Sequence, residues 1–353
     1  MNHLLREQIV QRLYSELDGL AESAAKFLLA ESDSPTPSEP PLDMLRSHVL
    51  SLADSVLMNS PALFEAHLLQ ARQQRPARAE LMLRQHLMAL RQALLLRLNV
   101  GEYVVVAAAL SAGSHWLSAP LPEGPPETPV DADEKTLLFA QMAADYLTLL
   151  LGADRRGATR LLLDAASNGT DVRDLYLYVL QPAQREVGNR WHSGEISVAE
   201  EHYCTAATAS VMAQLQPYFQ DTPRNGRLLL AACISGDLHT LGLQMVADFL
   251  EHDGWEVRYL GASTPIDSIL RMIADQGAEL VLTAASMAHH VPLIRELVAA
   301  IRRDPATRHV RVVVGGRPFL YDNELWERTG ADAWAGSADQ AVEVVRGLFK
   351  KKG

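Results

Sequence analysis

The chain contains only two cysteines, Cys204 and Cys233, among its 353 residues. Two thiols cannot form a disulfide framework or a four-cysteine zinc site. The chain also has no excess of positive charge, because 43 acidic residues against 32 basic ones give a formal net charge of −11. This balance excludes a global electrostatic attraction to the phosphate backbone of nucleic acids.

Long apolar runs are absent as well. The longest stretches, such as Val104–Ala112, are too short to span a bilayer. Met1–Leu20 alternates charged residues with leucines, so it lacks the apolar region of a signal peptide. Aromatic residues make up only 6% of the chain, but hydrophobic residues reach 48%, which is enough for sizeable cores. We therefore expect a multi-domain cytoplasmic protein without a membrane segment.

Two proline-rich stretches divide the chain. Ser32–Pro41 and Ala119–Asp133 combine proline, serine and acidic residues without a helical period, which is typical of linkers or exposed loops. The expected organisation has four parts: a helical module of unknown role over 1–118, a proline-rich linker over 119–133, a four-helix bundle over 134–221 and a sheet domain over 226–350.

The amino-terminal third predicts helices, because leucines recur at helical spacings throughout Leu42–Trp116. The same region carries arginines opposed only by Glu80, namely Arg72, Arg75, Arg78, Arg84, Arg91 and Arg97. A solvated helix face explains this run more simply than a binding patch for a partner or for nucleic acid. The sequence of this third contains no recognisable helix-turn-helix or zinc-finger pattern.

Four helical segments follow the second proline-rich stretch: Lys135–Leu151, Arg155–Ser167, Asp171–Arg190 and Ser197–Phe219. The last segment begins with Ser197 and Glu200, which have the spacing of a capping box. Four helices joined by short connections predict a four-helix bundle.

From Arg227 onward, short β-rich runs alternate with helical segments. The expected strands are Leu228–Ile234, Trp255–Leu260, Glu279–Ala284, Val310–Val314 and Asp332–Ala335. The expected helices are Thr240–His252, Pro265–Gln276, Val291–Arg303, Asn323–Thr329 and Ala338–Lys350. This alternation predicts a Rossmann-like (flavodoxin-like) α/β domain with a five-stranded parallel sheet. Ligands bind such sheets at the carboxyl ends of the strands, so we expect the site in the loops that follow them.

The loop after the first expected strand has the pattern Asp237-x-His239-x-x-Gly242. It lacks the glycine pattern of a dinucleotide site and the lysine of a phosphate-binding loop. It offers instead an imidazole with a carboxylate two residues before it, and a metal-ligating histidine needs its second nitrogen bonded to such a group. Gly242 allows a bulky group to lie against the next helix. A helix-capping aspartate and a surface histidine are the simpler alternative.

Small residues follow two other expected strands. Ser286 comes after the third, and Gly315 and Gly316 come after the fourth, which leaves room for a slot between the sheet and its helices. Taken with the first loop, this pattern resembles the cobalamin-binding domain of methionine synthase, mutases and corrinoid proteins. The resemblance implies that His239 is the lower axial ligand of cobalt, that Asp237 supports it, and that Gly242, Ser286, Gly315 and Gly316 contact the cofactor and its nucleotide tail.

A second group of chemistry-bearing residues joins the third and fourth helices of the expected bundle. Trp191 ends one helix, and Glu201 and His202 lie in the first turns of the next. Small residues at Ala206, Ala209 and Ala213 form a stripe that admits a flat macrocycle. Core packing of the tryptophan and a first-turn acid favoured by the helix dipole are alternatives. A zinc site is another, formed by His192, Glu201, His202 and Cys204.

The spacing of Trp191, Val198, Glu201 and His202 resembles that of the adenosylcobalamin-dependent photoreceptors of the CarH type. The resemblance implies that these residues cap the upper face of adenosylcobalamin. It also implies that His192 takes the upper cobalt position after light breaks the cobalt–carbon bond. The MerR-type DNA-binding domain of those repressors is not recognisable in Met1–Ala119. We therefore expect self-association or a protein partner, such as a transcription factor, in place of direct DNA binding.

Three hypotheses for function follow. The leading one is a cobalamin-binding light sensor and transcriptional regulator without catalytic turnover, in which photolysis shifts the capping bundle and changes oligomerisation or partner binding. The main alternative is a corrinoid methyl-carrier subunit of a methyltransferase, which would bind methylcobalamin. The third is an antirepressor-like adaptor that binds hydroxocobalamin or haem.

Overall fold

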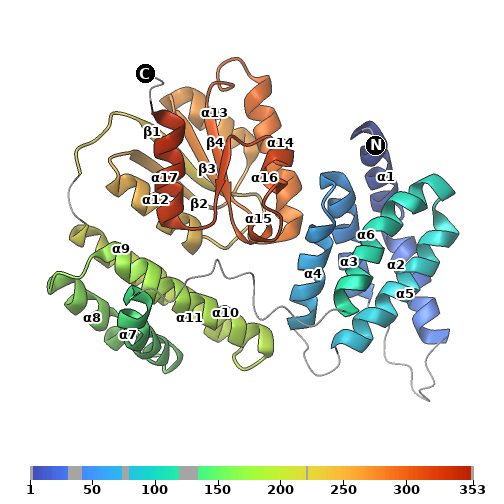
Figure 1. The fold of residues 1–353 in the computed structure, drawn as a ribbon, viewed down its shortest axis with the longest axis horizontal. Coiled ribbons are helices and arrows are strands. Elements are labelled where there is room, and N and C mark those ends of the chain that lie inside the picture. Colours follow the sequence, from blue (N-terminus) through green and yellow to red (C-terminus); the bar gives the residue numbers. More distant parts are fainter. Residues whose placement is uncertain (1–2, 31–41, 74–78, 119–133, 220–221, 351–353) are drawn as a thin grey trace. The chain divides into compact units, whose positions relative to one another are not determined.

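The computed structural model describes residues 3–30, 42–73, 79–118, 134–219 and 222–350 (Figure 1). Both proline-rich stretches, Ser32–Pro41 and Ala119–Asp133, lie outside these residues. By internal contacts the chain forms two compact units. The first comprises Met1–Pro125, Ser286–Glu296 and Arg317–Thr329, and the second comprises Pro126–Ala285, Leu297–Gly316 and Gly330–Gly353. Two short segments of the expected sheet domain therefore group with the amino-terminal helices.

The first unit is helical. Its amino-terminal elements are α1 (His3–Ser15), α2 (Leu17–Ala30), α3 (Leu42–Met58), α4 (Pro61–Gln73), α5 (Ala79–Arg97) and α6 (Val100–Ser118). Later in the chain it adds η3 (Ala288–His290), α15 (Arg317–Tyr321) and α16 (Leu325–Thr329). Leucines at helical spacing, such as Leu52, Leu83 and Leu90, are fully buried and form its core. The amphipathic pattern of the sequence accounts for this packing.

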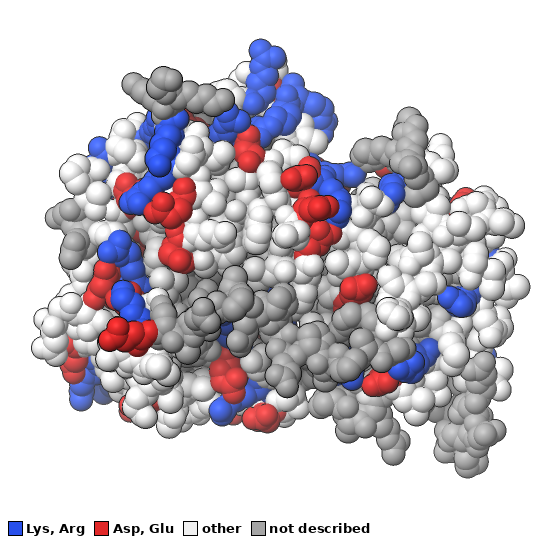
Figure 2. All heavy atoms as spheres, in the orientation of Figure 1, with Lys and Arg blue, Asp and Glu red and all other residues white. Residues whose placement is uncertain are grey.

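The arginines of this unit that the structure describes have partners. Arg72 and Arg84 pair with Glu80, Arg97 pairs with Glu16, and Arg91 donates to the hydroxyl of Ser111. Arg75 and Arg78 lie outside the described residues. Where basic side chains gather on the face shown in Figure 2, acidic ones lie beside most of them. Among the described helices, none is both long and apolar enough to cross a membrane.

The second unit begins with the helical bundle. Its elements are α7 (Glu134–Leu151), α8 (Arg155–Ser167), α9 (Val172–Leu175), η1 (Tyr176–Leu180), α10 (Gln181–Ser193), α11 (Val198–Leu215) and η2 (Gln216–Tyr218). Ser197 and Glu200 form the expected capping box at the start of α11. The third helix differs from the expectation of one regular α-helix, because a π-helical turn, η1, interrupts it.

The sheet of the second unit contains β1 (Leu228–Ile234), β2 (Glu256–Thr264), β3 (Leu280–Ala284), β4 (Arg311–Gly315) and β5 (Ala333–Ala335). All neighbouring strands are parallel, and their order is β2-β1-β3-β4-β5. This is the order of flavodoxin-like sheets and confirms the expected fold class. The helices that alternate with the strands are α12 (Leu241–His252), α13 (Ile266–Gln276), α14 (Val291–Arg303) and α17 (Ala338–Phe349).

The bundle and the sheet domain share a core within the second unit. Met245 and Phe249 of α12 and Ala338 of α17 are buried together with bundle residues such as Tyr146 and Leu215. Helix α12 starts directly after the loop that follows β1. The bundle is therefore anchored to the helix that carries the predicted cobalamin loop at its amino end.

Candidate functional site

The loop after β1 holds the imidazole of His239 in one orientation. The side chain of Asp237 is fully buried, and its Oδ1 accepts a hydrogen bond of 3.0 Å from the backbone N–H of His239. The same oxygen lies 3.0 Å from His239 Nδ1. Because an ionised carboxylate can only accept, it favours the tautomer with the proton on Nδ1. The other nitrogen, Nε2, then keeps its lone pair on a side chain that is 62% exposed.

The electrostatics of this loop favour a basic imidazole. The pKa of His239 is raised, mainly by its hydrogen bond to Asp237, while burial acts in the opposite direction. The charges of Asp237 and of Glu201 on α11 also raise this pKa. Glu201 therefore lies within electrostatic reach of His239, although the two residues belong to the bundle and to the sheet domain respectively. A basic, oriented imidazole is the kind of ligand that a transition metal binds.

The predicted cap residues lie where α10 ends and α11 begins. Trp191 is half-buried in the last turns of α10, and Val198, at the start of α11, is 52% exposed. Glu201 accepts a hydrogen bond of 2.8 Å from the hydroxyl of Thr205. The Nδ1 of His202 lies 3.1 Å from the carbonyl oxygen of Val198, and this imidazole is exposed. Nothing is described of the His192 side chain.

The predicted glycines divide into two kinds. A Cβ added to Gly242 at the start of α12 would meet no atom within 4 Å, so open space lies beside this backbone. A Cβ on Gly315 would lie 2.9 Å from the carbonyl oxygen of Ala335, and one on Gly316 would overlap the carbonyl of Ala285. Gly316 also has a φ of +101°. Close backbone packing at the sheet edge thus requires Gly315 and Gly316, whatever they contact in a bound state.

Ser286, the remaining predicted residue, begins a segment of the first unit and lines a cavity there. The structure therefore places His239 against Asp237 and within electrostatic reach of Glu201, and it leaves space at Gly242. The assignment of all these residues to a cobalamin site stays a prediction. The described residues contain no group of three or more potential metal ligands, and the side chain of His192, one of the four residues of the zinc alternative, lies outside them.

A corrinoid fits this arrangement better than a bare metal ion does. A corrin ring supplies the equatorial nitrogens of its own cobalt, so the protein needs to provide only one axial ligand. His239 has the features that such a ligand needs, with an exposed side chain and with Nδ1 held by a buried carboxylate. The open space at Gly242 lies three residues further along the chain.

One polar contact between the bundle and α12 has almost no signal in the sequence. The hydroxyl of Tyr176 in η1 donates a hydrogen bond of 2.9 Å to Oδ2 of Asp248 on α12, and the side chain of Gln216 also bonds to this carboxyl. The only sequence signal was an aspartate among the apolar residues of α12, beside Phe249.

Comparison with known protein families identifies two domains. Residues 227–346 match the family described as B12 binding domain, and residues 142–216 match a second family with the same description. The sheet domain and the bundle of this chain therefore match models of B12-binding domains, which supports cobalamin binding.

Individual relatives are corrinoid proteins. The chain is 24% identical over 221 residues to dimethylamine corrinoid protein 1 of Methanosarcina acetivorans, which covers 61% of this chain and 99% of that protein. It is 25% identical over 170 residues to dimethylamine corrinoid protein 3 of Methanosarcina mazei, and the match covers 46% of this chain and 98% of that protein. The solved structure of the Methanosarcina barkeri monomethylamine corrinoid protein is similar, with a TM-score of 0.55 and 20% identity. The match covers 60% of this chain and 100% of that chain. This last likeness shows the shared fold.

These comparisons change the order of the functional hypotheses. They support the methyl-carrier alternative better than the light sensor, and they do not specifically support a photoreceptor of the CarH type. They also give no support to a transcription factor as partner, and they do not distinguish methylcobalamin from adenosylcobalamin.

Proposed function

We propose that the chain is a corrinoid-binding methyl carrier that serves a methyltransferase. The observation that carries this proposal is the Asp237–His239 pair, with its exposed imidazole, at the carboxyl end of β1. The similarity to methylamine corrinoid proteins supports the methyl-carrying role. The partner in this proposal is a methyltransferase subunit.

The bound corrinoid would supply the cobalt that accepts and releases the methyl group. The chain itself would hold the corrinoid through His239 Nε2, while Asp237 keeps the proton on Nδ1. Because Asp237 is fully buried, its carboxylate cannot exchange this hydrogen bond for water without moving. Glu201 faces the same region from the bundle and adds negative charge. On this proposal the carrier alone turns over no substrate.

Absorption spectroscopy of protein reconstituted with methylcobalamin tests the proposed ligand. The wild-type chain should retain the corrinoid on gel filtration with the spectrum of histidine ligation. His239→Ala should lose that spectral signature. His309→Ala is the matched control, because His309 is exposed just before β4, at the opposite edge of the sheet. An unchanged spectrum in His239→Ala would rule out the assigned ligand.

The light sensor is kept as a second candidate because Glu201, one of the predicted cap residues, lies within electrostatic reach of His239. The two candidates differ in cofactor preference and in response to light. A methyl carrier should bind methylcobalamin at least as well as adenosylcobalamin, and Trp191→Ala should keep this binding. A light sensor should prefer adenosylcobalamin and change its elution volume after green light, and that result would replace the carrier proposal.

A further inference from the structure

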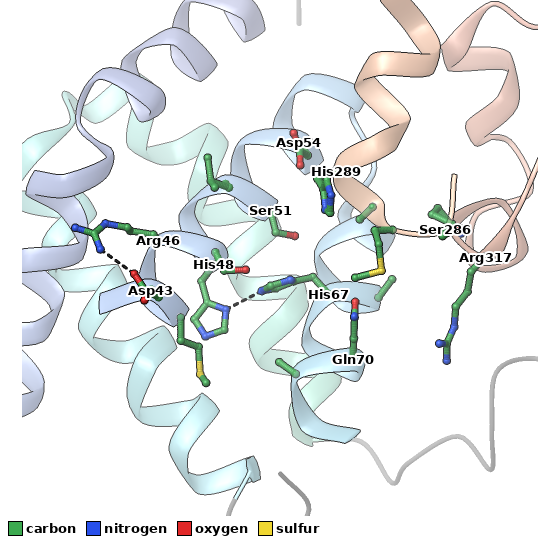
Figure 3. Close-up of a pocket in the computed structure, with 18 of the residues that line it drawn as sticks. Asp43, Arg46, His48, Ser51, Asp54, His67, Gln70, Ser286, His289 and Arg317 are labelled. Carbon is green, nitrogen blue, oxygen red and sulfur yellow. Dashed lines mark hydrogen bonds and ion pairs between the residues drawn. The ribbon is translucent and has the colours of Figure 1, made fainter. Parts of the chain in front are cut away.

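A cavity of about 980 Å³ lies in the first unit, and Ser286, one of the predicted corrinoid-contacting residues, is among the residues that line it. Figure 3 shows side chains from α3 and α4 pointing into it, together with residues from the segments that begin at Ser286 and Arg317. This volume is at the upper end of the range for sites that bind small organic molecules.

Two polar side chains of α3 that line the cavity have unused hydrogen-bonding capacity. Ser51 is 5% exposed, and its hydroxyl has no hydrogen-bond partner among the described residues. Asp54 is 4% exposed and lies three residues further along the helix, on the same face. Its carboxyl accepts one long hydrogen bond of 3.4 Å, from the hydroxyl of Tyr14. Buried polar groups without partners are costly, so a buried hydroxyl and carboxyl side by side suggest a missing donor.

No cation of the described residues neutralises Asp54. The two arginines that line the cavity have other partners, since Arg46 pairs with Asp18 and Asp43, and Arg317 donates to the hydroxyl of Tyr321. Burial accordingly raises the pKa of Asp54 to about 7. A buried carboxylate in this position is stabilised most by a ligand that carries a positive charge and N–H donors.

Two of the three imidazoles that line the cavity, those of His48 and His67, do not supply that charge; the third is His289. Nδ1 of His48 lies 2.8 Å from Nε2 of His67, and Nε2 of His48 lies 3.3 Å from Nδ1 of His86. Burial lowers the pKa of His48 and brings that of His67 to about 4, so both are neutral at pH 7. Neutral aromatic rings beside a carboxylate are a suitable environment for an organic cation.

We propose that this cavity binds an organic ammonium ion, whose N–H groups donate to Asp54 and Ser51 and whose organic body fills the space beside His67. The volume exceeds what a simple methylammonium ion fills, so the ligand class is an amine attached to a larger apolar or aromatic group. The residues proposed to hold the ammonium group, Asp54 and Ser51, do not belong to the predicted corrinoid site, although Ser286, which does, also lines the cavity.

Calorimetric titration of the full chain at pH 8 tests the proposal. The probes are benzylamine and hexylamine, and benzyl alcohol is the uncharged control of matched shape. At least one amine should bind, and benzyl alcohol should bind about tenfold more weakly or worse. Failure of both amines to bind, or equal binding of the alcohol, would overturn the proposal.

Three variants locate the binding. Asp54→Asn should lose about tenfold or more in amine affinity, and Ser51→Ala should lose a few-fold. Asp43→Asn is the control, because Asp43 is a fully exposed acid at the rim of the same cavity and should keep wild-type affinity. If Asp54→Asn does not fold, two measurements still test the proposal. They are the amine affinity of Ser51→Ala and the comparison of amine with alcohol binding in the wild type. If folded Asp54→Asn binds the amine with wild-type affinity, the amine binds at a site other than this cavity.

Discussion

The hydroxyl of Tyr176 donates a hydrogen bond of 2.9 Å to Oδ2 of Asp248, and both side chains are buried. Tyr176 belongs to the bundle, and Asp248 belongs to the helix that follows the His239 loop. Burial raises the pKa of Asp248 to about 6, whereas its hydrogen bonds act in the opposite direction. This contact therefore fixes the bundle to α12 at a point where water cannot replace the lost partner.

Tyr176→Phe removes the donor and leaves a buried carboxyl with fewer partners. We expect a loss of about 1–3 kcal/mol in the free energy of unfolding, as found when one member of a buried hydrogen bond is deleted. Urea unfolding followed by circular dichroism measures this loss. Tyr218→Phe is the control, since Tyr218 is 41% exposed and its hydroxyl only accepts from Ser167 at 3.2 Å. Equal effects of the two substitutions would contradict the expectation.

Asp237→Asn should lower the pKa of His239 in the cobalamin-free protein, because the carboxylate is the main cause of its raised value. The sign follows from linkage. The pair stabilises the folded protein fully below the ordinary histidine pKa, and this contribution is lost as pH rises through the raised value. NMR titration of the imidazole signals measures the midpoint. The signal of the exposed His309 should be the same in both proteins. If the titration midpoint of His239 is the same in Asp237→Asn as in the wild type, a group other than Asp237 raises its pKa.

Asp54→Asn should flatten the dependence of stability on pH. The folded-state pKa of Asp54 is about 7 and its ordinary value is 3.8, so the folded chain holds a proton that the unfolded chain has released. Stability of the wild type should therefore fall as pH rises from about 4 to 7. The variant should lack this component and be more stable at pH 8 by on the order of 2 kcal/mol. Melting temperatures between pH 5 and 8 test this, and parallel curves for the two proteins would refute it.

Gly242→Ala and Gly316→Ala should behave in opposite ways. The first adds a Cβ in open space, so we expect unchanged stability together with weaker retention of cobalamin on gel filtration. The second forces a side chain onto a backbone with φ of +101° and against the Ala285 carbonyl, which should lower the melting temperature strongly. Full cobalamin retention by Gly242→Ala would remove this glycine from the proposed site.

Much of the sheet domain could be predicted because its signals are local. Leu228–Ile234 is a strand with the expected bounds, since a short β-rich run next to a glycine-bearing loop is specified by adjacent residues. The spacing within Asp237-x-His239 likewise brings a carboxylate to Nδ1 through one turn of backbone. Helix α15 was not expected, because its start at Arg317 directly follows Gly316 and carries no capping signal.

Contacts between distant residues could not be predicted in this way. Tyr176 and Asp248 lie 72 positions apart, and the sequence of neither helix indicates which residue the side chain contacts. The cavity in the first unit poses the same problem, because Ser51 and Asp54 read as ordinary polar positions until α1 and α4 bury them. Burial by tertiary packing, rather than residue type, makes these groups chemically distinctive.

The π-helical turn at Tyr176–Leu180 has a consequence for the angular phase of the helix that contains it. Such a turn holds more residues than an α-helical one, and each residue of an α-helix turns the chain by about 100°. The residues after η1, including Trp191, are therefore rotated relative to the direction that Tyr176 faces. Deleting one residue within η1 would restore a regular helix but turn one end against the other. The Asp248 contact and the Trp191 orientation could then no longer be satisfied together.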